Sequence, residues 1–221
     1  MRKAYHRAIL LQALKGCFSE AALQILLAAN FRQDHLLYGQ VGHPEYHFDD
    51  NAFDAGWAYV EKNRSLIRPA LKAGDAPSAW RAFGRLTHAI QDFYSHSNYV
   101  ALWLGRFPEG EWPSPQEIDP LDESLLHSPE LSSGRIYLPL EPLSWIPGLS
   151  RLVLPLLPHD SHAWMNLDAP ERGPKYPYAF SAAVKRTRHE YEQTVRSLPS
   201  ELLALFCFPP PVPSQVRGED E

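Results

Sequence analysis

The stretch Leu86–Val100, LTHAIQDFYSHSNYV, constrains the fold more than any other part of the sequence. Its apolar residues recur at helical spacing, and it places His88, Asp92 and His96 four residues apart. Because an α-helix turns once in about 3.6 residues, side chains four apart lie on one face. A buried imidazole or carboxylate is costly unless it is paired, hydrogen-bonded or bound to a metal. The stretch therefore predicts a buried helix that carries candidate metal ligands.

Other segments with helical apolar spacing predict further helices, separated by glycines and prolines. Ser19 is the expected N-cap of the second helix, and Gly16 is the expected stop before it. The predicted helices span residues 2–15, 19–30, 52–66, 78–105, 178–197 and 201–208. These segments predict an all-α fold in a single domain, residues 1–208. Residues 209–221 are proline-rich and then charged, which is typical of a disordered tail.

Residues 107–160 differ from the rest because ten prolines interrupt them. Proline lacks an amide hydrogen and disfavours long regular structure, so we expect an irregular lobe with short helical turns. The second half of this lobe, LSWIPGLSRLVLPLLP, is strongly apolar. We expect it either to pack against the helices or to form an interfacial or substrate-channel surface.

Composition and charge limit the classes of function that are possible for this chain. The net charge of −5, without a long basic run, argues against a nucleic-acid partner. Two cysteines make no disulfide framework, whereas ten histidines favour a metal site with nitrogen and oxygen ligands. No apolar run reaches the roughly 18 residues of a membrane span. Polar residues interrupt the N-terminal apolar segment, so we expect a soluble protein, cytoplasmic or exported without a classical signal peptide.

Histidines and aspartates recur at predicted helix starts and on predicted helix faces. Imidazole and carboxylate are ligands that suit Zn²⁺. One ion needs three or four ligands, so the inventory is large enough for two or three zinc ions. The candidate ligands are His6, Asp34, His47, His88, Asp92, His96, His162 and Asp168. His159 competes with His162, while His35 and His43 are expected in loops beside the site.

Four motifs follow one another along the chain: YHRAILLQAL, EYHFDDNAF, HAIQDFYSHSNYV and HAWMNLD. Together they resemble the zinc-dependent phospholipase C superfamily, which includes the fungal single-strand-specific nucleases. The branch that looks most similar contains the fungal heterokaryon-incompatibility protein C. The resemblance covers residues 5–100 and 160–195. It implies an all-helical fold with a trinuclear zinc cluster at the base of a cleft.

The resemblance also implies roles for single residues. His88 and Asp92 match the family's HxxxD helix, whose aspartate bridges two metals, and His47 matches its HF-aspartate motif. Asp34 matches a further ligand that is proposed as a general base, and His6 matches an early histidine ligand. His162 and Asp168 are the choice for the remaining site. The chain departs from the family at His96, which follows Asp92 by four residues rather than six, and at Asn166, where an acid is expected.

The function implied by this resemblance is a zinc-dependent phosphodiesterase of phospholipase C type. A metal-activated water would hydrolyse glycerophospholipids, with Asp34 and Asp92 as catalytic residues. Its partners would be a phospholipid or another phosphodiester substrate, with peripheral membrane contact. Two alternatives stay open: a nuclease or nucleotidase that uses the same metals, and a non-enzymatic incompatibility or toxin-like protein with structural zinc.

Overall fold

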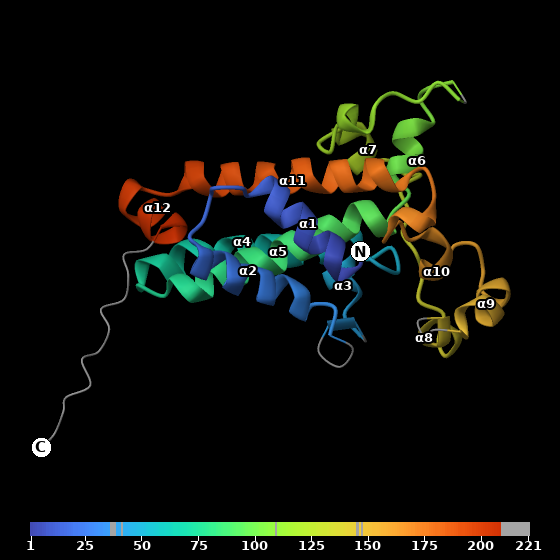
Figure 1. Ribbon diagram of the computed structural model, residues 1–221, viewed down its shortest axis with the longest axis horizontal. Helices are drawn as coiled ribbons and strands as arrows, with labels where there is room; N and C mark the ends of the chain where they lie inside the picture. Colours follow the sequence, from blue (N-terminus) through green and yellow to red (C-terminus); the bar gives the residue numbers. More distant parts are fainter. Residues whose placement is uncertain (36–38, 41, 109, 145, 147, 209–221) are drawn as a thin grey trace, which may run out of the picture.

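The computed structural model describes residues 1–35, 39–40, 42–108, 110–144, 146 and 148–208 (Figure 1). Within them the fold is all-α, as predicted, and pairing between extended segments is limited to two isolated bridges. The predicted tail, residues 209–221, lies outside the described residues. The longer helices are α1 (Lys3–Ala13), α2 (Glu20–Arg32), α4 (Phe53–Lys72), α5 (Ala76–His96) and α11 (Tyr176–Ser197). The short ones are α3 (Pro44–His47), α6 (Tyr99–Leu104), η2 (Pro115–Glu117), α7 (Glu123–Leu126), α8 (Leu140–Ser144), α9 (Ser150–Val153), η3 (Leu154–Leu156), α10 (His162–Met165), η4 (Pro170–Arg172) and α12 (Ser200–Cys207).

Helix α5 is the centre of the bundle. It packs against α2, α4 and α11, and every residue from Leu86 to His96 is buried (Figure 1). A helix buried on all sides has no solvent face, so its polar residues must find partners inside the protein. Gly84 allows the close crossing with α2, because a Cβ atom there would lie 2.4 Å from the carbonyl oxygen of Leu26. The predicted buried helix is therefore present, with its polar stripe inside.

Two predicted helix boundaries are wrong. We expected one helix over residues 78–105, but α5 ends at His96 and α6 begins at Tyr99. Ser97 is extended, and its hydroxyl donates to the carbonyl oxygen of Phe93, so a local side-chain bond replaces the helical continuation. We also expected the helix over 52–66 to end before Pro69, but α4 continues to Lys72. Buried Leu71 shows that core packing holds this last turn despite the proline.

The proline-rich residues 107–160 contain only short helices in their described part, as expected. Val153, Leu157 and Ala163 form a small hydrophobic cluster of their own, apart from the main core. Figure 1 shows α8 and α9 projecting from the bundle beside α10. In the described ranges, no helix is both long and apolar enough to span a bilayer.

Candidate metal centre

Four candidate ligands from three parts of the chain converge at the middle of α5. They are His6 of α1, Asp34 after α2, and His88 and Asp92 of α5, with one donor atom from each lying within 4.8 Å of the others. The Nε2 atom of His88 is 3.0 Å from Asp92 Oδ2, and the Nε2 atom of His6 is 3.2 Å from Asp92 Oδ1. Asp34 approaches the two histidines at 3.6–3.8 Å. We call these four residues the first cluster.

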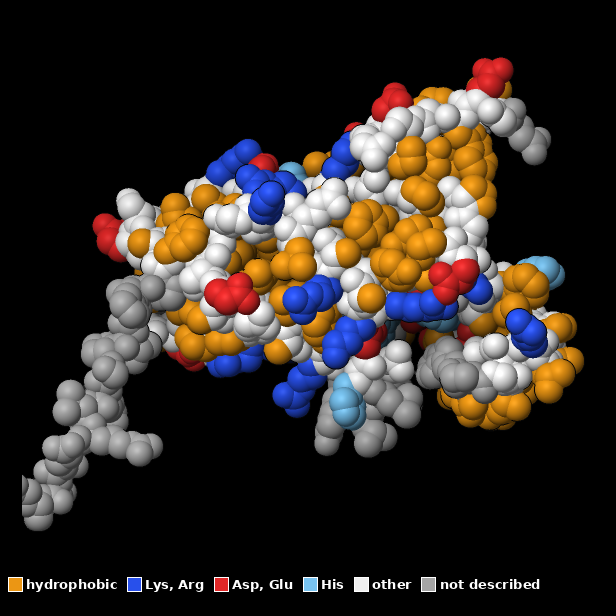
Figure 2. All heavy atoms as spheres, in the orientation of Figure 1, with side chains coloured by type: hydrophobic (Ala, Val, Ile, Leu, Met, Phe, Trp, Pro, Cys, Tyr) orange, Lys and Arg blue, Asp and Glu red, His pale blue; other side chains and the backbone are white. Residues whose placement is uncertain are grey.

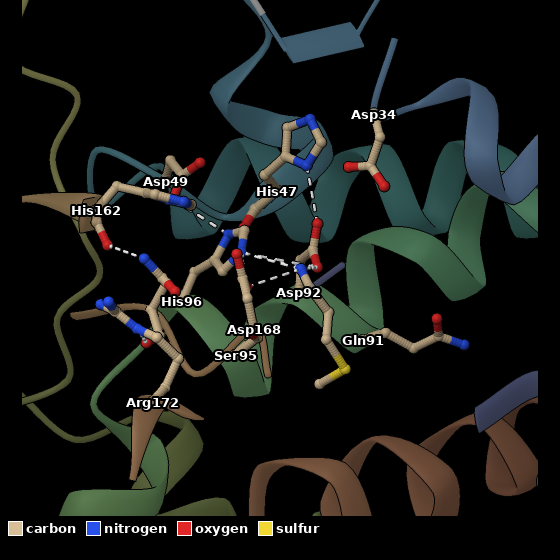
Figure 3. Close-up of polar contacts among 12 residues, drawn as sticks. Asp34, His47, Asp49, Gln91, Asp92, Ser95, His96, His162, Asp168 and Arg172 are labelled. Carbon is tan, nitrogen blue, oxygen red and sulfur yellow. Dashed lines mark hydrogen bonds and ion pairs between the residues drawn. The ribbon is translucent and has the colours of Figure 1, made fainter. Parts of the chain in front are cut away.

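A second cluster lies one turn further along α5 (Figure 3). It consists of Asp49, His96 and His162, whose donor atoms also lie within 4.8 Å of one another. Asp49 Oδ1 is 2.9 Å from the Nδ1 atom of His162 and 3.3 Å from that of His96. Asp168 borders this cluster, because its Oδ1 atom lies 3.0 Å from the other ring nitrogen of His96.

His47 joins the two clusters. Its Nδ1 atom lies 2.8 Å from Asp92 Oδ2 and 3.2 Å from the Nε2 atom of His88, and its carbonyl oxygen faces the Nδ1 atom of His96 at 3.1 Å. Asp92 thus has His6 and His96 near one carboxylate oxygen and His47 and His88 near the other. A carboxylate in this position could bridge two ions.

The turn that follows α3 positions Asp49. Phe48, Asp50 and Asn51 all have positive φ, near 57°, which is uncommon for residues other than glycine. Neither Asp50 nor Asn51 caps the next helix, because α4 has no side-chain cap. Instead, Asp50 accepts a hydrogen bond from the Ile136 amide, and Asn51 accepts one from the Ser133 amide. The turn is therefore held by the segment beside the second cluster.

His162 is placed by a close backbone contact. Its amide donates to the carbonyl oxygen of Arg135, and the neighbouring Gly134 donates to the carbonyl oxygen of His96. A Cβ atom on Gly134 would lie 2.5 Å from the Cα atom of His162. Glycine at this position therefore lets His162 approach α5.

His6 is oriented by Gln91. The Nδ1 atom of His6 lies 2.6 Å from Gln91 Oε1, while the amide nitrogen of Gln91 donates to the hydroxyl of Thr187. Since that nitrogen can only donate, the oxygen of Gln91 must face His6 and accept a hydrogen from Nδ1. The Nε2 atom of His6 then carries a lone pair and has no hydrogen-bond partner. It lies 3.2 Å from the Oδ1 atom of Asp92.

The electrostatics keep the carboxylates ionised. Burial raises the pKa of Asp92, but the Met1 ammonium and His96 lower it by more. The pKa of Asp92 therefore lies well below its ordinary value. Burial also raises the pKa of Asp49, while His162 and His96 lower it more. Asp168 follows the same pattern, because the Met1 nitrogen at 3.0 Å and His96 outweigh its burial.

The histidines differ in protonation. Burial lowers the pKa of His88 to about 4, although Asp92 and Asp34 oppose the shift, so His88 is neutral near pH 7. Burial also lowers the pKa of His96, but Asp92, Asp49 and Asp168 raise it more, to about 10. For His47, burial is likewise outweighed by Asp92, and its pKa is raised. In the metal-free protein His96 is therefore cationic, whereas His88 offers a lone pair.

A pocket of about 180 Å³ opens on both clusters. Asp34, Asp49, His96, His162 and Asp168 contribute to its wall. Asp34 keeps 22% of its side-chain surface exposed, whereas His6, His88 and Asp92 are fully buried. The centre is thus closed toward the bundle and accessible from the side of Asp34.

The structure brings together all eight residues that the sequence singled out, and His162 rather than His159 lies at the centre, because His159 stacks on Trp164 instead. His43 points away and pairs with Glu45. Two participants were missed. Asp49 is next to the HF motif but was not separated from its acidic neighbours, and Gln91 looked like an ordinary residue between two ligands.

Comparison with known proteins shows similarity to one family over part of the chain. Residues 3–107 match the family model described as the VWA7 N-terminal domain. The von Willebrand factor A domain-containing protein 7 of Homo sapiens is 35% identical over 123 residues, which cover 53% of this chain and 14% of that protein. The protein of the same name from Rattus norvegicus is 37% identical over 82 residues, 37% of this chain and 9% of that protein. The chain thus spans a small part of the curated relatives it matches. No solved structure matches it.

These matches contradict the resemblance to the zinc-dependent phospholipase C superfamily and its heterokaryon-incompatibility branch. The resemblance was the basis for predicting a phosphodiesterase of phospholipase C type and for classifying the chain as a hydrolase. Both predictions are therefore wrong as well. The physical reason for the error is that these motifs reflect only the spacing of possible metal ligands. Histidine and aspartate at i and i+4 on a buried helix suit many different metal sites. A shared ligand pattern does not carry a shared reaction.

Proposed function

We propose that this chain is a zinc-binding domain that holds two ions. One ion would lie in the first cluster, between His6, Asp34, His88 and Asp92, and the other in the second cluster, between Asp49, His96 and His162. His47 and Asp168 would support both sites from the border. The described residues offer two such groups of donors, so the third ion expected from the sequence stays a prediction.

The observation that carries this proposal is the Nε2 atom of His6. Its hydrogen-bonded neighbour Gln91 leaves this buried nitrogen with a lone pair and no hydrogen-bond partner, 3.2 Å from the Asp92 carboxylate. Two electron-rich atoms at this distance repel each other, and the Met1 ammonium that pairs with the same carboxylate oxygen does not satisfy the His6 nitrogen. A metal ion would remove the repulsion and satisfy the nitrogen.

The donor set favours zinc over harder cations. Each cluster mixes imidazole nitrogens with carboxylate oxygens, the ligands that Zn²⁺ prefers, whereas Mg²⁺ and Ca²⁺ prefer oxygen alone. Bound zinc would act as a Lewis acid and lower the pKa of a coordinated water. Enzymatic activity at this centre stays a prediction, and the proposed function requires only metal binding.

Metal binding would also join separate elements. The first cluster links α1, the segment after α2, and α5, while the second links the turn after α3, α5 and α10. Because a preformed site is absent from an unfolded chain, binding free energy contributes to folding. The zinc ions would therefore hold together segments that are far apart in sequence.

Elemental analysis of the full chain, purified without chelator, tests the proposal. We expect about two zinc ions per chain in the wild type, in line with two donor clusters. Asp34→Asn removes one charge from the least buried ligand of the first cluster and should reduce zinc in that site. His162→Gln should reduce zinc in the second. His127→Gln is the matched control, since His127 is exposed and pairs only locally with Glu123.

The zinc content of the variants distinguishes support for the proposal from contradiction. Loss of zinc from the two site variants, with full zinc in His127→Gln and unchanged helical circular dichroism in all three, supports the proposal. Wild-type protein that holds no stoichiometric zinc after exposure to excess zinc and gel filtration contradicts it. Equal zinc in all variants also contradicts it, because the metal would then lie elsewhere.

A further inference from the structure

A second hollow, of about 510 Å³, lies among α2, α3, α4 and α5. Its volume is in the range of small-molecule binding sites. Ala28 and Ala29 of α2 form part of its wall, and their short side chains leave this space between the helices open. None of its lining residues belongs to either cluster of candidate zinc ligands. The hollow is therefore separate from the metal centre.

The charge of this hollow is positive. Three arginines line it, Arg32 of α2 and Arg81 and Arg85 of α5, and none of its lining residues in the described part of the chain is acidic. We call it the arginine pocket. On the face that Figure 2 shows, further Lys and Arg side chains gather near the end of α2. Because the whole chain carries a net charge of −5, this concentration of positive charge is local, and it favours an anionic ligand.

Two arginines of the pocket have no acidic partner. Arg81 donates to the hydroxyl of Ser78, and the Nε atom of Arg85 donates to the side-chain oxygen of Asn63. Within the described residues these two arginines form no ion pair, and the terminal nitrogens of Arg85 make no hydrogen bond. Arg85 is only half-buried, so an incoming anion could reach these donors.

The acids next to the pocket are engaged elsewhere. Glu45 precedes a tyrosine of the pocket wall, and its carboxylate lies 3.1 Å from the Nδ1 atom of His43. Asp75 caps α5 by accepting from the Ser78 amide. The Ser78 hydrogen bonds lower the pKa of Asp75 most, and Arg81 contributes least to this shift. The positive charge of the pocket is therefore not neutralised by these acids.

Two tyrosines add hydroxyl groups to the wall. The rings of Tyr46 and Tyr59 lie 4.4 Å apart between centroids, and both residues line the pocket. The hydroxyl oxygen of Tyr59 accepts from the amide nitrogen of Gln33, so its own hydrogen remains to be donated. Burial raises the pKa of Tyr59 to about 12, so this hydroxyl is protonated near neutral pH. Tyr59 can thus donate to an anion beside the arginines.

The number of arginines favours phosphate over carboxylate. A guanidinium group binds phosphate oxygens through two parallel hydrogen bonds. A carboxylate carries one negative charge, whereas a phosphate monoester carries about 1.5 to 2 near pH 7. A diphosphate group carries more than a monoester and comes closest to the charge of three arginines.

We propose that the arginine pocket binds a diphosphate group, with Arg81 and Arg85 on its oxygens and the Tyr59 hydroxyl as a further donor. Inorganic diphosphate and a nucleoside diphosphate supply the same group. The proposal does not depend on zinc binding, because the pocket shares no residue with the two clusters.

Isothermal titration calorimetry of the full chain with sodium pyrophosphate tests the proposal. We expect the wild type to bind and Arg81→Gln/Arg85→Gln to lose affinity by about tenfold or more, because charge-assisted hydrogen bonds are lost. Arg68→Gln/Arg151→Gln is the matched control, since it removes two charges from exposed arginines outside the pocket. His162→Gln changes the metal centre alone and should bind pyrophosphate like the wild type.

Two further measurements identify the ligand and guard against misfolding. Tighter binding of adenosine diphosphate than of pyrophosphate supports a nucleoside diphosphate, and equal binding supports inorganic diphosphate. Thermal melting without ligand shows whether the double variant is folded. If it is not, Arg81→Gln alone should still weaken binding, because Arg81 is exposed and bonds only to Ser78 within the described residues.

Four results would overturn the proposal. Wild-type protein that gives no binding at millimolar pyrophosphate has no such site, and unchanged affinity in the folded arginine variants places the anion elsewhere. Loss of binding in His162→Gln, with full binding in the arginine variants, places it at the metal centre. Acetate that binds as tightly as pyrophosphate removes the preference for phosphate.

Discussion

The Nδ1 atom of His6 lies 2.6 Å from the Oε1 atom of Gln91, and this contact determines which ring nitrogen of His6 faces the carboxylates. Helix α1 delivers the imidazole, but the tautomer depends on a residue of α5. Partners of this kind orient metal ligands and raise their basicity. Gln91 is therefore the positioning residue of the first cluster.

Replacing Gln91 separates orientation from simple packing. Gln91→Leu removes the acceptor, and we expect zinc affinity at the first cluster to fall by roughly 10–100-fold. Gln91→Glu keeps an acceptor for His6 and should retain most of the affinity. Competition with a fluorescent chelator measures both. Gln24→Leu is the control, because Gln24 bonds only to exposed Glu20. Equal affinities in Gln91→Leu and wild type would contradict the assigned role.

Metal removal should lower stability. At a zinc concentration of about 100 times the dissociation constant, binding adds about 2.7 kcal/mol per site to the free energy of unfolding. Each kcal/mol shifts the melting temperature of a chain of this size by about 2–4 °C. Thermal melting with zinc and after chelation measures the difference, and Asp34→Asn should show a smaller one. Identical melting curves with and without zinc would argue that no ion is bound in the folded state.

The pKa of His96 predicts a pH dependence of the metal-free protein. Burial lowers this pKa, but Asp92, Asp49 and Asp168 raise it from 6.5 to about 10. The folded state therefore holds the proton more tightly than the unfolded chain, and the stabilisation is fully present below pH 6.5 and lost as the pH rises toward 10. The free energy of unfolding of wild type relative to His96→Gln should thus fall over this range. A difference that stays constant from pH 6.5 to 10 would show that His96 does not titrate in this way.

The centre shows what local sequence can and cannot predict. The spacing of His88, Asp92 and His96 was enough to place three side chains on one stripe of a buried helix, because helical periodicity is a local property. Asp49 could not be singled out, since its position depends on a left-handed turn that is held by Ser133 and Ile136 far along the chain.

Local sequence was also insufficient to predict where α5 ends and which function the chain has. The hydroxyl of Ser97 competes with the helix through a single contact to Phe93, and apolar periodicity carries no signal for such a contact. The motifs predicted the convergence of imidazoles and carboxylates. They did not predict the similarity to the VWA7 N-terminal domain, because many chains can build a similar ligand geometry.

Gly134 offers a test that reaches one cluster without changing any ligand. A Cβ atom at this position would lie 2.5 Å from the Cα atom and 2.9 Å from the amide nitrogen of His162, and backbone atoms cannot move away easily. We therefore expect Gly134→Ala to displace His162, to destabilise the fold by about 1–3 kcal/mol as overpacking does, and to weaken zinc binding at the second cluster. The first cluster should keep its ion, because within the described residues the hydrogen bonds of Gly134 join it to His96 and Asp50 rather than to a ligand of that cluster. Elemental analysis should then find about half of the wild-type zinc, in line with one remaining site. Gly105→Ala is the control, since its Cβ atom would lie 3.3 Å from the carbonyl oxygen of Ala101. Full zinc content in Gly134→Ala would mean that His162 is not a ligand, and loss of both ions would mean that the two sites do not bind independently.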